Sequence, residues 1–453
     1  MAVWSNTALS TIKTQFGRFD AEFYKPEFLD TDRTLSSIDC VTLRRVASKI
    51  DVGHVGPMVR HYSDTGVLLL QTQNVREFFL ELSNSVRIAP EFHASLVKSQ
   101  VHKGNILIAR SGSFGSAAIY LENAVINSAD IIIVQIDDPR INPLYAVTFM
   151  NTQYGSVQFV RFASGGVQGH VNLRILEHFR IPILDEIEQE QIAEVVQEAY
   201  AARTASSEMY SEAQQLFEKE LGLDKLTFQK TVGYNERFGT VGLSTILSVG
   251  RIDAQCFAPD ALLYDSWLQA RGQCDRLASL VRSTAKGRQH ADIPNGLIDY
   301  CSIKHISRRE LVDVSRCSPS PDTPMAGLDD LLLAITGATI GKIGIVKRYE
   351  RLAFSGDLLC LLTAEQIDPH YLLLALDHRL GQVQFTRWIT GSTNGHLAWR
   401  DIARVLVPRL DDDTEAKIAV LVKNSLSKRW DSDQLLDNAK GRVEQLIKEI
   451  VHT

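Results

Sequence analysis

The sequence predicts a mixed α/β protein built as a tandem repeat, in which two globular α/β domains are each followed by a long α-helix. Three observations predict this class. Stretches of the second half repeat stretches of the first in one register, short apolar runs resemble buried strands, and two long segments carry apolar residues at helical spacing. A chain of 453 residues has room for about two to four domains of ordinary size.

The repeat is clearest near the end of each globular part. GSVQFVRFASGGVQGH (155–170) matches GQVQFTRWITGSTNGH (381–396), 226 positions further on (155 to 381). NPLY (142–145) and DPHY (368–371) keep the same separation (142 to 368). Several matches at one constant separation along the chain indicate internal duplication rather than turns that became similar independently.

The two halves differ mainly across residues 40–100 and 270–325, so each half has a variable front and a shared back. We predict five segments. They are a first globular domain (1–185), a first long helix (186–222), a linker (223–249), a second globular domain (250–410) and a second long helix (411–453).

Short apolar runs in both globular parts predict buried strands, and Pro-initiated runs predict short helices. The strands are 106–109, 131–136, 331–334 and 358–362, and the helices are 143–151 and 369–378. Asn142 and Asp368 stand where an N-cap residue is expected, directly before a proline at the first turn.

The long helices are predicted from apolar or small residues spaced alternately three and four apart, which is typical of a helix–helix seam. In the first helix these are Ile192, Val195, Ala199, Ala202, Ser206, Met209, Ala213 and Leu216, and Gly222 is the expected stop. In the second they are Ile418, Leu421, Val422, Leu436, Ala439, Val443, Leu446 and Ile450, with the pattern interrupted around 428–433.

Composition excludes several classes of protein. Hydrophobic residues make up 45% and charged residues 23% of the chain, as in ordinary globular proteins. No apolar run is long enough to cross a membrane, and the N-terminus lacks a secretory signal. Six scattered cysteines without a CxxC pair fit a reducing compartment. We therefore expect a cytoplasmic protein without membrane contact.

The net charge of −6 argues only weakly against nucleic-acid binding, because it is unevenly distributed. Residues 186–222 hold nine acidic and two basic residues, so most of the excess negative charge lies on the first long helix. The globular parts are neutral to slightly basic, which leaves room for a basic face.

Motifs that would support catalysis are incomplete. The loop 337–342 (GATIGK) is one residue short of a phosphate-binding loop, and Ile343 stands where a magnesium-binding hydroxyl is needed. NPLY lacks the residues of a methyltransferase motif, and its proline is better explained as a helix start. The chain contains no HExxH and no GxSxG. We expect neither a catalytic site nor a metal site, and a binding role becomes the better hypothesis.

With its order of globular part, helix, globular part and helix, the chain resembles the specificity subunit of type I restriction–modification enzymes. The resemblance covers nearly all of the chain. Its carriers are GRFDAEFYKPEF (17–28), GVLLLQTQNV (66–75), the Gly-rich turn 111–115, QFVRFASGG (158–166) and Ile181-Pro182 before ExxQxQ. The second half departs from the pattern at 296–303 (GLIDYCSI), which makes its reading loops harder to place.

The resemblance implies a DNA-binding subunit without catalysis in a phage-defence system. Each globular part would be a target-recognition domain for one half of a bipartite site in double-stranded DNA. The helices would pack as an antiparallel coiled coil that sets the distance between the halves. Two DNA methyltransferase subunits would dock on the helices, and restriction or translocase subunits would join them. No cofactor is expected in this chain, whereas S-adenosylmethionine would be bound by the partner.

Candidate base readers follow from a physical argument. Domains that read different sequences should differ at base contacts, and base edges are read by side chains with hydrogen-bond donors and acceptors. In the first half these are His54, Arg60, His61, Gln71, Gln73, Asn74 and Arg76. In the second half they are Arg282, Lys286, Arg288, Gln289, His290, Lys304 and Arg308. The run 283–290 reads as a loop that inserts into DNA, whereas solvated loop side chains are the simpler alternative for each residue.

Other interpretations stay open. Arg161 and Arg387, paired by the repeat, would contact phosphate or cap a neighbouring helix. The whole chain would alternatively belong to a related system with a fused methylase–nuclease partner, be an enzyme that modifies DNA by itself, or be a coiled-coil interaction scaffold.

Overall fold

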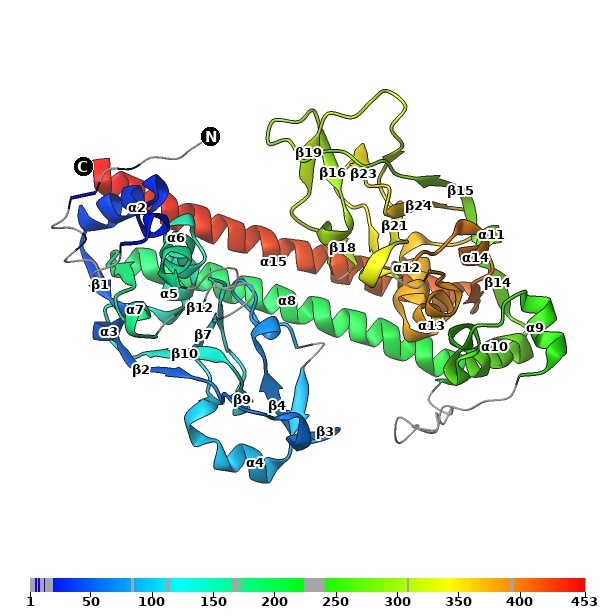
Figure 1. The fold of residues 1–453 in the computed structure, drawn as a ribbon, viewed down its shortest axis with the longest axis horizontal. Coiled ribbons are helices and arrows are strands. Elements are labelled where there is room, and N and C mark those ends of the chain that lie inside the picture. The colour runs from blue at the N-terminus through cyan, green and yellow to red at the C-terminus, as the bar shows by residue number, and fades with distance from the viewer. Residues whose placement is uncertain are drawn as a thin grey trace. The chain divides into compact units, whose positions relative to one another are not determined.

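The computed structural model describes residues 5, 7–8, 12, 19–82, 85–110, 115–164, 170–171, 173–223, 241–307, 309–391 and 395–452 (Figure 1). The chain forms two compact units, one of residues 1–203 with 430–453 and one of residues 204–429. Each unit therefore holds one globular part and a stretch of both long helices. This division cuts both long helices, so the five segments drawn from the sequence remain a proposal.

The helices of the first half are short except for the last one. They are η1 (Ala21–Tyr24), α2 (Pro26–Ser36), α3 (Leu43–Val46), η2 (Val59–His61), η3 (Thr72–Asn74), α4 (Pro90–Ser95), η4 (Val97–Ser99), α5 (Pro143–Met150), α6 (Gln153–Phe162), α7 (Leu173–Leu176) and α8 (Glu186–Leu221). The N-cap predicted before α5 is confirmed, because the Asn142 side chain accepts a hydrogen bond from the Leu144 N–H at 2.9 Å.

The strands of the first half form two main sheets and two strand pairs. They are β1 (Cys40–Thr42), β2 (Ala47–Val52), β3 (Tyr62–Ser63), β4 (Val67–Leu70), β5 (Val86–Ile88), β6 (Gln100–Val101), β7 (Ile106–Ala109), β8 (Ala117–Ile119), β9 (Ile126–Ser128), β10 (Ile131–Ile136), β11 (Ala163–Ser164), β12 (His170–Val171) and β13 (Arg180–Pro182). The main sheets have the orders β2-β10-β7-β8 and β3-β5-β4-β9-β6, and β1 pairs with β13 and β11 with β12.

Strand β10 is buried on both faces, as its continuous apolar run predicts. Ile132 and Val134 face a core shared with α5, α6 and the long helices. Ile131 and Ile133 face a second core shared with Leu70 of the neighbouring sheet. The sheet β2-β10-β7-β8 is thus the middle layer of the first unit, and the sheet with β4 lies on its far side from the helices (Figure 1).

The second half has a similar succession of elements, with differences in its short helices and strand pairs. Its helices are α9 (Leu243–Val249), η6 (Ala254–Phe257), α10 (Pro259–Arg271), α11 (Leu277–Leu280), η7 (Ile303–His305), η8 (Gly337–Thr339), α12 (Pro369–Asp377), α13 (Arg379–Trp388), α14 (Trp399–Ile402) and α15 (Asp412–His452). Helix α9 falls within the segment that the sequence analysis treats as a linker.

The strands of the second half reproduce the two main sheets. They are β14 (Cys274–Arg276), β15 (Val281–Lys286), β16 (Ile298–Cys301), β17 (Ile306–Ser307), β18 (Glu310–Leu311), β19 (Ser315–Cys317), β20 (Met325–Ala326), β21 (Leu331–Ala334), β22 (Ile343–Ile345), β23 (Leu352–Phe354), β24 (Leu358–Thr363) and β25 (Leu406–Pro408). The sheets have the orders β15-β24-β21-β22 and β19-β16-β23-β20, and β14 pairs with β25 and β17 with β18.

The structural repeat includes residues 40–100 and 270–325, where the two halves differ most in sequence. Strand β4 runs parallel to β9 with Leu69 opposite Asn127, and β16 runs parallel to β23 with Tyr300 opposite Ala353. The predicted Gly-rich turn of the second half is confirmed, because η8 joins the buried strands β21 and β22. The front that looks variable in sequence therefore has the same topology in both halves.

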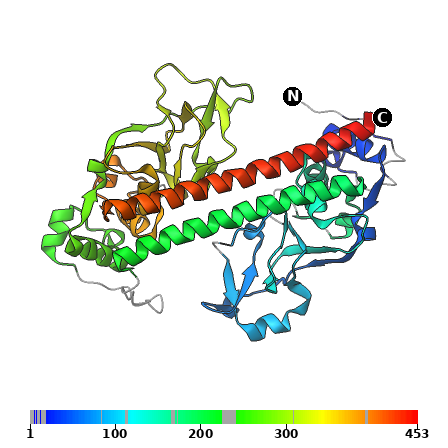
Figure 2. The same cartoon turned by 180° about the vertical axis from the view of Figure 1, so that it is seen from behind.

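The two long helices run beside each other within each unit (Figures 1 and 2). In the first unit they are antiparallel, because Glu188 pairs with Arg442 and Arg203 with Asp433. In the second unit the Ser425 hydroxyl donates to the Ser206 carbonyl at 2.7 Å. Helix α8 ends at Leu221, directly before the expected stop at Gly222, whose φ is +70°.

The predicted seam of α8 is half right. Ile192, Ala199, Ser206 and Ala213 are buried as predicted. The alternate positions lie one residue later than predicted, at Val196, Arg203, Tyr210 and Phe217. The error has a physical reason, since a search for apolar residues cannot choose Arg203, which pairs with Asp433 and lies over the Phe79 ring. In α15 the expected Ile450 is exposed, and Ile447 is buried instead.

Candidate nucleic-acid interface

A glycine marks the point in each half where the chain crosses from the first main sheet to the second. A Cβ on Gly53 would lie 2.6 Å from the Ser128 hydroxyl oxygen, and one on Gly287 would lie 2.2 Å from the Phe354 carbonyl oxygen. A larger residue cannot be placed at either position without moving the backbone. The next residues, His54 and Arg288, begin the polar loops that follow.

These two crossings are equivalent in their hydrogen bonds. The His54 N–H donates to the Ser128 carbonyl at 2.8 Å, and the Arg288 N–H donates to the Phe354 carbonyl at 2.9 Å. His54 and Arg288 therefore occupy the same place on their respective folds, each with its backbone fixed. Matching the first half to the second by sequence did not pair these two residues, because the halves differ in length between this region and the matched segments.

In the first half, three predicted residues gather around one aromatic ring that the sequence analysis missed. The His61 ring stacks on Phe92 with 3.7 Å between ring centroids and 9° between planes. His54 meets the same ring edge-on at 6.1 Å. The Arg60 Nε donates to His61 Nε2 at 3.1 Å. Helix α4, which carries Phe92, thus supports a cluster of three predicted readers.

Two glutamines form a second group on the same side of the fold. The Gln73 amide donates to the Gln71 side-chain oxygen at 3.1 Å, and the Gln71 amide donates to the Tyr62 hydroxyl at 3.0 Å. Tyr62 was not among the predicted residues. All three side chains are at least partly exposed. Glutamine amides held by side-chain hydrogen bonds keep defined donor and acceptor directions, which base readout requires.

Asn74 has a different role from the other predicted residues of the first half. Its side chain is 1% exposed, accepts from the Gln71 N–H at 2.7 Å and donates to the Glu81 carbonyl at 2.7 Å. Both ends of the amide are used to hold the turn that presents Gln71 and Gln73. We therefore assign Asn74 to the support of the loop, whereas Arg76 is exposed on the surface beside it.

In the second half, the predicted loop is partly a strand. The run 283–290 contains the last four residues of β15, where Lys286 pairs with Leu359, and becomes a loop only at Gly287. The expectation of one inserting loop is corrected in this respect, because pairing with β24 satisfies the backbone. Arg282 and Lys286 are exposed on this edge strand, and Gln289 is exposed in the loop.

The remaining predicted residues of the second half are held by polar contacts. The Arg288 guanidinium lies 3.5 Å from the Ser320 hydroxyl. His290 Nε2 lies 3.3 Å from the Thr323 hydroxyl, and its ring meets Tyr300 edge-on at 5.7 Å. Thr323 and Tyr300 are further residues that the sequence analysis missed. Arg308 lies outside the described residues.

Lys304 forms an exposed ion pair with Asp292 at 2.9 Å. Hydrogen bonds from Lys304 and from Ser315 lower the pKa of the Asp292 carboxyl below its usual value. Because both partners are solvent-exposed, this pair adds little to the stability of the fold. The ammonium group of Lys304 remains exposed to solvent in this pair.

Helices η3 and η7 occupy the same place and show how the halves differ. In the second half, His305 takes the position of Asn74 and accepts from the Ser302 N–H at 2.9 Å. His305 is 4% exposed, and burial lowers the pKa of its imidazole. Both residues end the same pattern, a strand followed by a turn, at 67–74 and 298–305. This shared pattern could have revealed the pair, but the two segments differ in sequence.

Aliphatic side chains are also exposed on the two loops that follow the crossing glycines. Val55 and Val59 are 67% and 76% exposed in the first half, and Leu297 is 76% exposed in the second. Exposed aliphatic groups among donors and acceptors suit the edge of a base pair, where thymine presents a methyl group.

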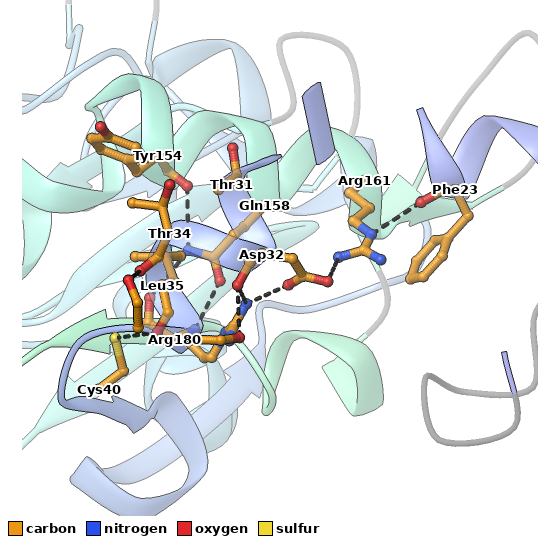
Figure 3. Close-up of polar contacts among 12 residues, drawn as sticks. Phe23, Thr31, Asp32, Thr34, Leu35, Cys40, Tyr154, Gln158, Arg161 and Arg180 are labelled. Carbon is orange, nitrogen blue, oxygen red and sulfur yellow. Dashed lines mark hydrogen bonds and ion pairs between the residues drawn. The ribbon is translucent and has the colours of Figure 1, made fainter. Parts of the chain in front are cut away.

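The paired arginines of the shared back are both buried, and each pairs with a carboxylate on a helix of its own half. Arg161 is buried and donates to Asp32 of α2 and to the Phe23 carbonyl, and Arg180 contacts the same carboxylate (Figure 3). Arg387 is likewise buried and pairs with Asp265 of α10. Their guanidinium groups hold α2 and α10 onto the domains of their respective halves, and Arg161 also caps η1 by donating to the Phe23 carbonyl in its last turn.

Two searches of the described residues bear on other kinds of site. No group of three or more His, Cys, Asp or Glu side chains in this part of the chain is placed to hold a metal ion. Among the same residues, no helix combines the length and apolarity that a bilayer span requires.

Comparison with known proteins gives a family match for part of the chain. Residues 81–210 match the model described as the type I restriction modification DNA specificity domain. The S subunit of a type I restriction–modification system from M. genitalium is 14% identical, with 91% of this chain and 95% of that chain covered and a TM-score of 0.43. The HsdS subunit from Thermoanaerobacter tengcongensis is 12% identical over 91% and 95%, with a TM-score of 0.28. A search of curated protein sequences gave no match.

Proposed function

We propose that the chain belongs to the family of type I restriction–modification DNA specificity domains, whose model matches residues 81–210, and that it reads a bipartite DNA site for a methyltransferase that it docks. The observation that carries this proposal is the repetition of one fold. The family match begins in the first half, and the second half has a sheet of four strands like β2-β10-β7-β8 and a second sheet with four of the five strands of the other. A chain with two such domains would offer two reading surfaces.

We assign the reading of bases to the loops that follow the two crossing glycines. In the first half, His54, Arg60, His61, Gln71 and Gln73 supply donors and acceptors that lie in two supported groups. Glutamine pairs with adenine and arginine with guanine in the major groove. Val55 and Val59 add apolar surface for thymine methyl groups.

In the second half, we assign the same task to Arg288, Gln289, His290 and Lys304. Arg282 and Lys286 lie on an edge strand and are better suited to phosphate contacts, which position the protein without reading sequence. Different residues at equivalent places, such as His54 and Arg288, would make the two halves prefer different sequences.

The long helices are proposed as the spacer and the docking site. They would form an antiparallel coiled coil that fixes the distance between half-sites and binds two methyltransferase subunits, with restriction or translocase subunits joining the complex. The acidic surface of α8 would then face a protein partner, since DNA phosphates would repel it. The chain itself would be non-catalytic and act in the cytoplasm, with S-adenosylmethionine bound by the partner.

The test is a pull-down of the tagged chain from its native cells, followed by mass spectrometry and by mapping of methylated sites in the genome. We expect recovery of an S-adenosylmethionine-dependent methyltransferase and methylation at a split sequence. The matched variant Arg288→Ala should retain the methyltransferase and alter the methylated sequence, which separates docking from reading.

Other outcomes would replace the proposal. Recovery of a fused methylase–nuclease would place the chain in the related kind of system. Recovery of unrelated proteins, with no methyltransferase and no change in methylation when the chain is deleted, would leave an interaction scaffold and end the DNA-reading assignment.

A further inference from the structure

The second unit contains a cavity of about 850 Å³ that the proposed reading of DNA does not use. Its walls come from α9, α10, α13, β14 and the turn before β25. We call it the arginine cavity after three lining residues, Arg276, Arg387 and Arg404. Asp265 is the one acidic side chain that lines it, so the lining carries an excess of two positive charges.

Arg387 is buried at the back of this cavity with part of its guanidinium unused. It is 4% exposed and pairs with Asp265 through Nη1. Its Nε is buried and has no hydrogen-bond partner among the described residues. A buried guanidinium N–H without an acceptor is unfavourable, so a ligand that supplies an oxygen would stabilise this site.

Arg276 and Arg404 are exposed and form no ion pair with the described residues. The guanidinium of Arg404 lies 5.3 Å from the centre of the Trp388 ring, and that of Arg387 lies 5.1 Å from it. Both guanidinium groups therefore lie against the same indole at the cavity wall. Guanidinium groups that line one cavity can bind a shared anion.

The first half satisfies the equivalent carboxylate differently. There the carboxylate of Asp32, which corresponds to Asp265, contacts both Arg161 and Arg180 (Figure 3). Strand β25 carries Leu406 where β13 carries Arg180, so Asp265 has a single arginine partner. The equivalent carboxylates thus have two arginine partners in one half and one in the other.

The lining defines the class of ligand. Planar guanidinium groups match the oxygens of phosphates in a two-pronged geometry. The volume lies within the range of sites for small organic molecules, and the walls include Leu262, Val249 and Leu406 beside Gln384. The elements of the cavity lie on the side of the second unit away from β16 and β19, where the proposed reading residues are (Figures 1 and 2).

We propose that the arginine cavity binds the phosphate monoester of a small organic molecule, with Arg276, Arg387 and Arg404 around the phosphate and the aliphatic wall against the organic part. This site is separate from the proposed DNA-reading loops and does not depend on them.

Isothermal titration calorimetry of the full chain tests this with ribose 5-phosphate and adenosine monophosphate. Adenosine and inorganic phosphate serve as ligand controls. We expect saturable binding of both monoesters and none of adenosine. Because Arg276 and Arg404 are exposed, Arg276→Gln and Arg404→Gln should fold normally and each weaken binding about tenfold or more. Arg44→Gln, an exposed arginine of the first half, should leave binding unchanged.

Several outcomes would overturn the proposal. The first is the absence of binding up to about 10 mM ligand, and the second is an affinity in both cavity variants equal to that of the native chain. The third is binding of inorganic phosphate as tight as that of the monoesters, which indicates an adventitious ion only. Displacement of ribose 5-phosphate by a short random DNA duplex would instead assign the arginines to the DNA backbone.

Discussion

At the scale of single residues, support and recognition are divided between neighbouring side chains. Asn74 and His305 are buried and hold equivalent turns, whereas Gln73 and Lys304 beside them are exposed. A buried amide or imidazole with backbone partners cannot also reach a base. The turn is therefore kept in both halves while its exposed residues differ, which allows sequence preference to change without loss of the fold.

Arg288→Ala should relax discrimination at one half-site. If this guanidinium makes a two-pronged contact with a base, its loss costs about 1–3 kcal/mol of preference at that position. The measurement is the methylated sequence and the DNA affinity of the variant in complex with its partner. Arg400→Ala, an exposed arginine on α14, is the matched control. An unchanged preference at both half-sites would contradict the assignment.

His305 should make the stability of the second half depend on pH. Burial lowers its pKa in the folded chain, so the unfolded chain binds more protons near the ordinary histidine pKa of 6.5. Its contribution is present above about pH 6.5 and decreases as the pH falls. Thermal unfolding between pH 5 and 8 measures this.

The variant His305→Asn installs the residue that the first half uses at this position. Asparagine can accept from the same backbone N–H without titrating, so we expect a folded chain whose unfolding depends less on pH. A pH dependence equal to that of the native chain would assign the effect to other groups.

At the scale of elements, the strands and helices of the middle layer follow from local sequence. Strands β7, β10 and β21 begin and end as predicted, because their runs of β-branched and aliphatic residues suit burial on both faces. The seam of α8 was predicted only in part, since its alternate positions include Arg203. An ion pair within a helix contact depends on the partner helix and leaves no apolar signal.

Insertion of one heptad into both long helices should lengthen the spacer of the DNA site. The insertions belong after Arg203 and after Arg429, where the two units divide. Seven residues add about 10.5 Å of helix, equivalent to about three base pairs at 3.4 Å each. The spacing between methylated half-sites reports the change. A spacing that stays fixed would reject the role of the helices as a spacer.

At the scale of the whole molecule, repetition of one fold is the main functional feature. Both halves place a polar loop after a glycine crossing, and both are followed by a long helix. Two similar folds with different exposed residues suit a DNA site of two unlike halves. The arginine cavity lies where the two halves differ, since Asp32 pairs with both Arg161 and Arg180 whereas Asp265 pairs with Arg387.

The purified chain should not methylate DNA by itself. Incubation with labelled S-adenosylmethionine and mixed DNA should give no transfer, and addition of the recovered partner should give transfer. Methyl transfer by the chain alone, at a stoichiometry above that of any contaminant, would show that the chain has a catalytic centre of its own.

The sequence by itself determined the duplication, the long helices and the buried strands, because each rests on a periodicity that neighbouring residues carry. It also indicated which loops are polar. Only the tertiary structure decided which polar residues are supports and which are exposed, since this depends on contacts between distant residues. The Phe92 ring under His61 and the pairing of Arg387 with Asp265 are such contacts, and no local pattern encodes them.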